Sequence, residues 1–258
     1  MDIFYKIFLT LFGLLIGSFL NAVIYRVPRR ISIITPRSSC TKCKKLIHWY
    51  ENIPLISFLL LKGKCSKCKT LISISYPLIE LTCGVVAFLL VPQRVTSEAL
   101  IYFVFYFGTF AVLLAQFLID LEHKLLPDSI NIVLVLLILP VTIINQKWNF
   151  WLLGGLLGFG FPFVVTWFFY LLKGKVGLGG GDIKLFGILG LYLGVKGIFL
   201  NLFLSCMLGS VIGLSLIYFL KRDKKEPIPF GPFIIFVAVI QIYFPSYFRE
   251  FSRHFLGF

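Results

Sequence analysis

The sequence predicts an all-helical protein that crosses a membrane many times and carries one small metal-binding loop between its first two helices. Hydrophobic residues make up 59% of the 258 residues and charged residues 14%, whereas a soluble domain has about 45–50% apolar and about 25% charged residues. Mean hydropathy is +0.94, and apolar runs of membrane-spanning length recur along the chain. A secretory signal would give one short run with a small-residue cleavage site, so the first run is expected to be a retained helix.

Eight spanning helices are expected, of which the sixth is the shortest. They are centred on residues 4–25, 74–92, 99–119, 129–145, 151–172, 183–195, 198–220 and 231–245. This assignment divides the chain into a first transmembrane helix at 1–25, a loop at 26–73 and a membrane core at 74–258. No low-complexity tract and no internal repeat is expected.

Basic residues are segregated to one side of this predicted topology. If the N-terminus lies outside, most of the 25 basic residues fall in or beside the cytoplasmic loops, and both ends of the chain lie outside. The cytoplasmic loops are then 26–73, 120–128, 173–182 and 221–230. The net charge of +14 is therefore a consequence of topology, and no nucleic-acid partner is expected.

Four of the six cysteines form two short hooks in the loop 26–73. Cys40 and Cys43 form the first hook, and Cys65 and Cys68 form the second after 21 intervening residues, which is close to the spacing of four-thiolate zinc sites. A redox pair and four unrelated thiols are the alternatives. Thiols in a cytoplasmic loop stay reduced. Four cysteine ligands leave no open position for water, so a structural zinc ion is expected. The other two cysteines lie in apolar runs and are expected to be packed side chains without function.

Three of the 11 acidic residues lie at cytoplasmic ends of predicted spans. Asp120 ends the third span, where the helix dipole disfavours an anion, so a purely structural role is less expected there. Asp128 follows a proline before the fourth span and is expected to cap that helix. Asp182 also opens a helix, so capping applies to it as well. It differs in ending a glycine run, which lets the backbone approach a ligand closely, although a flexible linker is the alternative for such a run.

Helix packing can bring Asp120 and Asp182 together at one depth. Two carboxylates in a partly dehydrated site share a proton and titrate as a pair, so they can act as a general acid and a general base around one water. Gly179, Gly180 and Gly181 would let a substrate backbone approach, pairing as an added strand. There is no H-E-x-x-H or G-x-S-x-G motif. Because ionisable residues near membrane-helix ends are often solvated caps, the residues alone leave both interpretations open.

The chain resembles the bacterial type IV prepilin peptidases, also called leader peptidase/N-methyltransferases, which belong to the G-x-G-D class of membrane aspartic proteases. The resemblance runs almost end to end through several ordered motifs. They are GSFLNAVIYRVP at 17–28, ENIPLISFLLLKGKCSKC at 51–68, ISYPLIE at 74–80, IDLEHKLLPD at 119–128, GLGGGDIKLF at 177–186 and IPFGPF at 228–233.

The resemblance implies that Asp120 and Asp182 are the catalytic aspartates, that Gly179 and Gly181 are the G-x-G part, and that the hook cysteines hold zinc. It implies cleavage of prepilins or pseudopilins, of a type IV pilus or of a secretion or competence system, at the cytoplasmic face of the bacterial inner membrane. Membrane lipid is an expected partner, because anionic lipid would offset the repulsion between a basic leader and the basic loop.

The resemblance also implies N-methylation of the new N-terminus with S-adenosylmethionine. No Rossmann-type glycine fingerprint is present, so this cofactor would be held by the loop 26–73 and adjoining helices. Glu80, an ionisable residue in apolar surroundings, is the candidate for binding the substrate amine. A buried contact with Asn21 or with a cytoplasmic lysine is the equally open alternative.

Two other functions compete with this interpretation. A membrane transporter would use intramembrane acids to carry protons or cations, and it would place them near the bilayer midplane. Asp120 and Asp182 lie at span ends instead. A noncatalytic pilus-assembly subunit would use the hooks as a docking module, and changing either aspartate would then leave processing intact.

Overall fold

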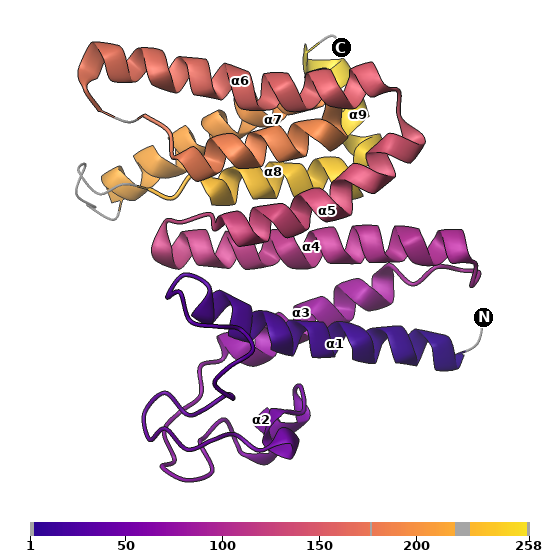
Figure 1. Cartoon of the computed structure of the whole chain (residues 1–258), viewed down its shortest axis with the longest axis vertical. Coiled ribbons are helices and arrows are strands. Elements are labelled where there is room, and N and C mark those ends of the chain that lie inside the picture. The colour runs from indigo at the N-terminus through magenta and orange to yellow at the C-terminus, as the bar shows by residue number, and fades with distance from the viewer. Residues whose placement is uncertain (1–2, 176, 220–227, 257–258) are drawn as a thin grey trace. The chain divides into compact units, whose positions relative to one another are not determined.

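The computed structural model describes residues 3–175, 177–219 and 228–256, and within them it confirms an all-helical protein without a named strand. Figure 1 shows long helices joined mostly by short connections, apart from the extended loop between α1 and α3. Five helices are long and apolar enough to cross a membrane, namely α1 (Ile3–Arg26), α4 (Ser97–His123), α5 (Asp128–Asn145), α6 (Trp148–Lys173) and α7 (Gly180–Phe219). Shorter apolar helices are α3 (Ser75–Leu89) and α8 (Gly231–Tyr243).

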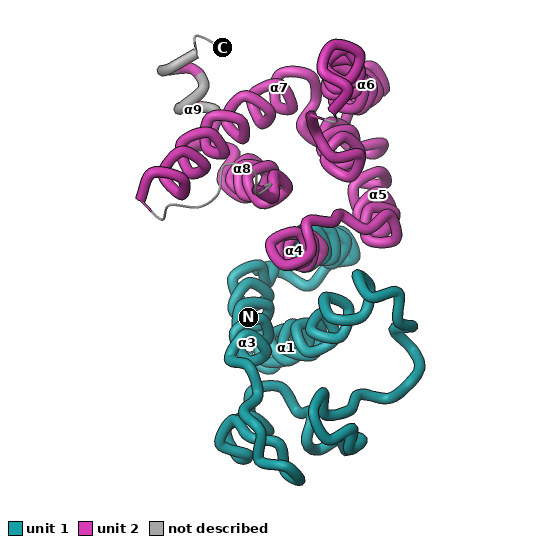
Figure 2. The backbone as a smooth tube through the Cα atoms, turned by 90° about the vertical axis from the view of Figure 1, so that its left-hand side faces the viewer, with its two compact units in different colours: residues 1–111 teal, residues 112–258 magenta. Residues whose placement is uncertain are grey.

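The chain divides into two compact units, Met1–Ala111 and Val112–Phe258, coloured in Figure 2. The first contains α1, α3, the start of α4 and the loop between α1 and α3, in which a 3₁₀ turn (Trp49–Asn52) and α2 (Ile56–Leu60) form. The second contains the rest of α4 and the helices after it. This division does not test the three functional parts predicted with boundaries at residues 25 and 73.

In the first unit, α1 and α3 pack at glycine contacts. A Cβ atom added to Gly13 would stand 2.5 Å from the Ala87 Cβ, and one added to Gly17 would stand 2.7 Å from the Glu80 Cα. Missing side chains therefore let the two helix backbones approach closely, as is common between membrane helices. Near the end of α1, the Asn21 side chain donates a hydrogen bond to the Tyr76 carbonyl at 3.2 Å.

Helix α7 is two helical segments joined at Gly194, where φ is 67° and ψ is −177°. Phe186 and Ile198 would lie about 18 Å apart on a straight helix. Both nevertheless flank Gly158 of α6, since a Cβ there would meet the Phe186 carbonyl at 2.6 Å and the Ile198 side chain at 3.1 Å. The chain therefore reverses at Gly194, and the two segments correspond to the separate spans predicted at 183–195 and 198–220.

Buried amides join the second segment of α7 to α8. Asn201 donates to the Gln241 side-chain oxygen at 2.8 Å and to the Ile234 carbonyl at 3.3 Å, and Gln241 donates to the Gly197 carbonyl at 2.9 Å. Such contacts satisfy polar groups that lipid cannot. Two helices of the described residues were not expected: the short α2 within the loop, and α9 (Pro245–Leu256), which is too polar to be found by a search for membrane spans.

The glycine packing of α6 predicts a large difference between two alanine substitutions. At Gly154 a new Cβ would stand 2.7 Å from the Gly194 Cα and even closer to the Gly190 carbonyl, whereas at Gly160 nothing lies within 4 Å. Gly154→Ala should lower the stability of the detergent-solubilised protein by about 1–3 kcal/mol, and Gly160→Ala should leave it unchanged or slightly raise it. Thermal unfolding of both variants checks this, and equal melting temperatures would contradict the packing.

Candidate functional site

The four hook cysteines form a cage of a size that fits a metal ion. All four sulfurs lie within 4.8 Å of one another. The Cys40 and Cys68 sulfurs are 3.8 Å apart, and those of Cys43 and Cys65 are 3.9 Å apart. Four sulfurs bound tetrahedrally at about 2.3 Å from one ion lie roughly 3.8 Å from each other. The geometry therefore supports the prediction that these residues can hold a tetrahedral metal ion.

The two hooks are copies of one structure, so the expectation of no internal repeat is wrong. In each hook the backbone N–H of the first cysteine donates to a carbonyl five residues later, at 2.9 Å to Lys45 and at 2.8 Å to Thr70. The residue after each second cysteine is left-handed, with φ of 57° at Lys44 and 58° at Lys69. The sequence signal is the pattern C-x-K-C-K-x-L-I, which occurs at 40–47 and again at 65–72.

An ionic clip joins the two hooks. The Lys45 ammonium of the first hook donates to Glu51 at 2.8 Å and to the Ser66 hydroxyl of the second hook at 2.7 Å. The second Glu51 oxygen accepts the His48 backbone N–H at 3.0 Å. Together, chiefly through the Lys45 hydrogen bond, these donors lower the pKa of the Glu51 carboxyl to about 2. Because Glu51 is the only acidic residue in the loop 26–73, this contact has no substitute there.

Thr70 takes the position in the second hook that Lys45 has in the first. Its hydroxyl lies 3.2 Å from the Cys68 sulfur, and this hydrogen bond is the largest effect holding the pKa of the Cys68 thiol below its usual range. A thiolate is the form that binds metal. The two copies have therefore diverged, with one supplying the clip and the other stabilising a ligand.

Glu80 holds the loop onto α3. Its side chain is buried, with 8% exposed, and it accepts the Leu55 backbone N–H at 2.8 Å. Leu55 has φ of 59° and ψ of −48°, a conformation rarely adopted by a residue with a side chain. Asn21, an alternative partner considered from the sequence, donates to a backbone carbonyl instead.

Asp120 and Asp182 lie together in the second unit. Asp120 is in the last turn of α4 and 5% exposed, and its Oδ2 atom is buried without a hydrogen-bond partner. Asp182 is in the first turn of α7 and partly buried. The two carboxyl groups are close enough to interact electrostatically. A pair of acids in such dehydrated surroundings is the arrangement that general acid–base chemistry requires.

Three backbone segments meet closely around these acids. A Cβ added to Gly181 would stand 2.8 Å from the Leu126 Cβ, and one added to Gly231 would stand 2.7 Å from the Asp120 Oδ2 and 3.3 Å from Leu126. Leu126, in the connection between α4 and α5, is thus a neighbour of the starts of both α7 and α8. At Gly180 nothing lies within 4 Å of an added Cβ, which leaves one side of the glycine run open.

The structure corrects the role expected for Asp128. Pro127 is the residue at the N-cap, and Asp128 is the first residue of α5. Both Asp128 oxygens accept from the Lys184 ammonium, at 2.7 and 2.8 Å. This ion pair joins the start of α5 to α7, because Lys184 lies two residues after Asp182. Asp182 is the third residue of α7, and its carboxyl group lies against the backbone of Gly179, just before the helix begins at Gly180, so the capping interpretation stays open for it.

Sequence reasoning missed a buried amide pair one helical turn from Asp120. The Gln116 amide of α4 donates to the Asn131 oxygen of α5 at 2.7 Å. Gln116 is completely buried and Asn131 is 4% exposed, yet Gln116 Oε1 and Asn131 Nδ2 have no partner. Polar residues inside membrane helices are the signal that could have found them. The unpaired Gln116 oxygen is an acceptor and the unpaired Asn131 nitrogen is a donor, and one water molecule can satisfy both.

These features define a class of protein, a multi-pass helical membrane protein with a four-cysteine metal cage in a loop and an aspartate pair at helix ends. Two family models match the chain: the bacterial peptidase A24 N-terminal domain over residues 11–93, and the type IV leader peptidase family over residues 107–214. No solved structure matches it.

Curated relatives extend over most of the chain. It is similar to the prepilin leader peptidase/N-methyltransferases of Xanthomonas campestris pv. campestris (35% identical over 253 residues, 86% of this chain and 85% of the relative) and Stutzerimonas stutzeri (36% over 257 residues, 86% and 84%). The protein of that name from Pseudomonas aeruginosa is 32% identical over 278 residues, covering 96% and 93%. The chain belongs to the type IV leader peptidase family, which confirms the resemblance seen in the sequence.

Proposed function

We propose that this protein cleaves the leader peptide of type IV prepilins or pseudopilins and methylates the new N-terminal residue. Family membership supports both activities, because the relatives are named as prepilin leader peptidases and N-methyltransferases. The observation that carries the peptidase assignment is that the buried Asp120 and the partly buried Asp182 are neighbours at helix ends. A transporter is disfavoured, because these acids lie in the last turn of α4 and the first turn of α7 and not at mid-helix.

Asp120 and Asp182 exchange acid and base roles around one water. One aspartate, ionised, takes a proton from water as the water oxygen attacks the peptide carbonyl, and the other, protonated at the start, gives its proton to the leaving amine as the C–N bond breaks. Asp120 Oδ2 has no protein partner, so it is available to hold that water. Gly179, Gly180 and Gly181 form the approach for the substrate backbone, which is open at Gly180.

The metal ion in the cysteine cage is zinc with a structural role. Cys40, Cys43, Cys65 and Cys68 fill its four positions, so the ion, when bound, supplies folding energy to a loop too small to build a core. S-adenosylmethionine is held by this loop and the helices beside it, and Glu80 binds the amine to be methylated. The Leu55 contact supports this placement, since it joins Glu80 directly to the loop.

The protein lies in the bacterial inner membrane with its active site facing the cytoplasm. The basic residues of the loop 26–73, which Glu51 alone offsets, support this orientation. The same charges favour contact between the loop and anionic lipid.

Replacing either catalytic aspartate should abolish cleavage. Asp120→Asn and Asp182→Asn each remove one proton-transfer group, so the rate of prepilin cleavage in membranes should fall by about 10²–10⁴-fold. Asp128→Asn weakens only an exposed ion pair with Lys184 and should keep cleavage within a few-fold of wild type. Melting temperatures verify folding. Cleavage retained by a folded Asp120→Asn or Asp182→Asn variant would refute the mechanism.

Metal analysis tests the cage and its clip. The purified wild type should contain about one zinc ion per chain, and Cys65→Ser should lose it. Glu51→Gln should weaken zinc affinity, measured by competition with a chelator, about 10–100-fold, as loss of outer-shell contacts does. Glu98→Gln, an exposed carboxylate in the first turn of α4, is the matched control. Wild-type protein purified without metal, and unable to bind added zinc, would overturn the zinc assignment.

Glu80→Gln separates the two activities. The amide oxygen can still accept the Leu55 N–H, whereas the charge that would bind an amine is gone. Mass spectrometry of the processed pilin should show cleavage at wild-type level and methylation reduced at least about tenfold. Glu98→Gln should change neither activity. Unchanged methylation in Glu80→Gln would leave Glu80 with only the anchoring role.

A further inference from the structure

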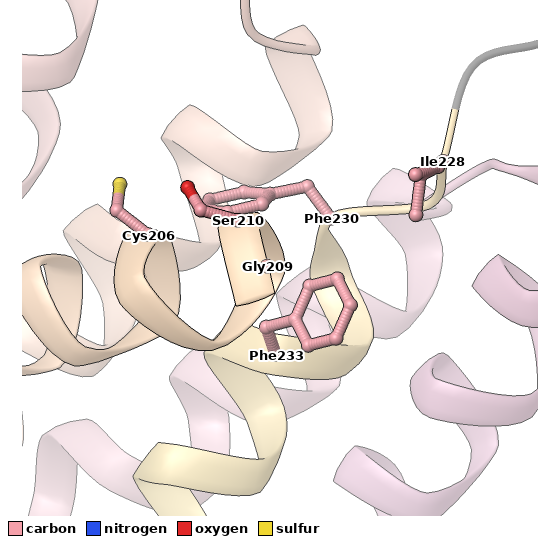
Figure 3. A pocket seen from close by; sticks show the side chains of 6 residues that line it. All are labelled: Cys206, Gly209, Ser210, Ile228, Phe230 and Phe233. Atoms are coloured by element: carbon pink, nitrogen blue, oxygen red, sulfur yellow. The ribbon is translucent and has the colours of Figure 1, made fainter. Parts of the chain in front are cut away.

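A cavity of about 240 Å³ lies between the second segment of α7 and the start of α8. Figure 3 shows the six residues that line it, of which three lie on the second segment of α7 and three in α8 or the stretch just before it. The Phe230 and Phe233 rings and Ile228 make it largely apolar, and Ser210 and Cys206 supply the polar atoms. The lining is therefore suited to an apolar group and offers no charge to bind an ion.

The cavity has the size of an aromatic side chain. The space is open on one side, and its volume exceeds the roughly 150 Å³ of an apolar cavity that takes up a molecule as large as benzene. Gly209 keeps the space open, because a Cβ at that position would stand 3.2 Å from the Phe233 ring and 3.4 Å from the Phe230 ring. Both rings already pack against each other, with centroids 6.2 Å apart.

The same aromatic wall contacts the elements that carry both aspartates. Phe230 is followed directly by Gly231, whose backbone abuts the Asp120 carboxyl group. The Phe230 ring centroid lies 6.4 Å from that of Phe186, which is one helical turn after Asp182 on α7. The wall of the cavity and the surroundings of the two carboxyl groups therefore share the start of α8 and the first turns of α7. Neighbouring residues of an extended peptide are about 3.3 Å apart along the strand, so a peptide bound at the carboxyl groups would carry its next side chains past this wall.

We propose that this cavity receives an apolar side chain of the peptide substrate beside the scissile bond, and that Phe230, Phe233 and Gly209 determine specificity at that position. The proposal rests on the proposed peptidase function. A lipid acyl chain is the other apolar occupant of such a site, but lipid would have no relation to the residue next to the cleaved bond.

Cys206 provides a direct readout of occupancy, since it lines the cavity and is exposed. The probe is a set of synthetic prepilin precursors that differ only in carrying Phe, Leu, Ala or Ser directly after the scissile bond. In the uncleaving Asp120→Asn background, the Phe precursor should slow N-ethylmaleimide labelling of Cys206 at least about tenfold, and the Ser precursor should not. Cys206→Ser identifies the labelled site. Labelling that is equally fast with every precursor, as lipid occupancy would give, overturns the proposal.

A filled cavity provides an independent kinetic test. Ser210→Leu places a larger side chain in the cavity, whereas Ser215→Leu makes the same change at a position of the same segment that does not line the cavity. Ser210→Leu should lower the ratio of kcat/KM for the Phe precursor to kcat/KM for the Ala precursor about tenfold, mainly by raising KM for Phe. Ser215→Leu should leave that ratio unchanged.

The outcomes distinguish failure of the peptidase function from failure of the specificity proposal. If wild-type protein cleaves none of the precursors, the peptidase function itself fails. If it cleaves them but Ser210→Leu changes both precursors equally, the cavity is structural and only the specificity proposal fails.

Discussion

The candidate site depends on the close contact between the Asp120 carboxyl group and the backbone of Gly231, where no side chain stands in the way. Asp120 is buried with one oxygen unpaired, and the start of α8 at Gly231 lies directly against it. Burying such a group costs free energy unless something binds it, and the proposed function assigns this atom to the attacking water. The reversal of α7 at Gly194 makes the arrangement possible, because it lets one helical hairpin begin at Asp182 and end on the same side, near the residues that precede α8.

The loop between α1 and α3 is held together by cysteine and ionic contacts and not by a hydrophobic core. A segment with one acidic and many basic residues cannot build a hydrophobic core. Two copies of one cysteine turn instead form a cage, the Lys45–Glu51–Ser66 clip joins the copies, and Glu80 ties the loop to α3. The clip and the anchor each depend on one acid, Glu51 and Glu80.

The sequence predicted whatever depends on composition and spacing. Hydropathy found the apolar helices, including the two segments of α7, and the cysteine spacing found the cage. Pairings between distant residues could not be predicted in this way, because they depend on how helices turn about their axes. The Asp128–Lys184 ion pair and the Gln116–Asn131 amide pair are examples, as is the contact between Gly231 and Asp120. The two hooks were found by their cysteines, but the extension of their shared pattern over eight residues was missed, because the copies are short.

The most direct test of the account is the proximity of residues 120 and 182 in the membrane. Asp120→Cys and Asp182→Cys, combined with Cys206→Ser, would be treated with a short bifunctional thiol reagent, and the linked peptides would be identified by mass spectrometry after proteolysis. The account predicts an efficient cross-link between the two positions in folded protein. Single modification at both positions without a cross-link would show that the two aspartates do not share one site, and would contradict the central claim.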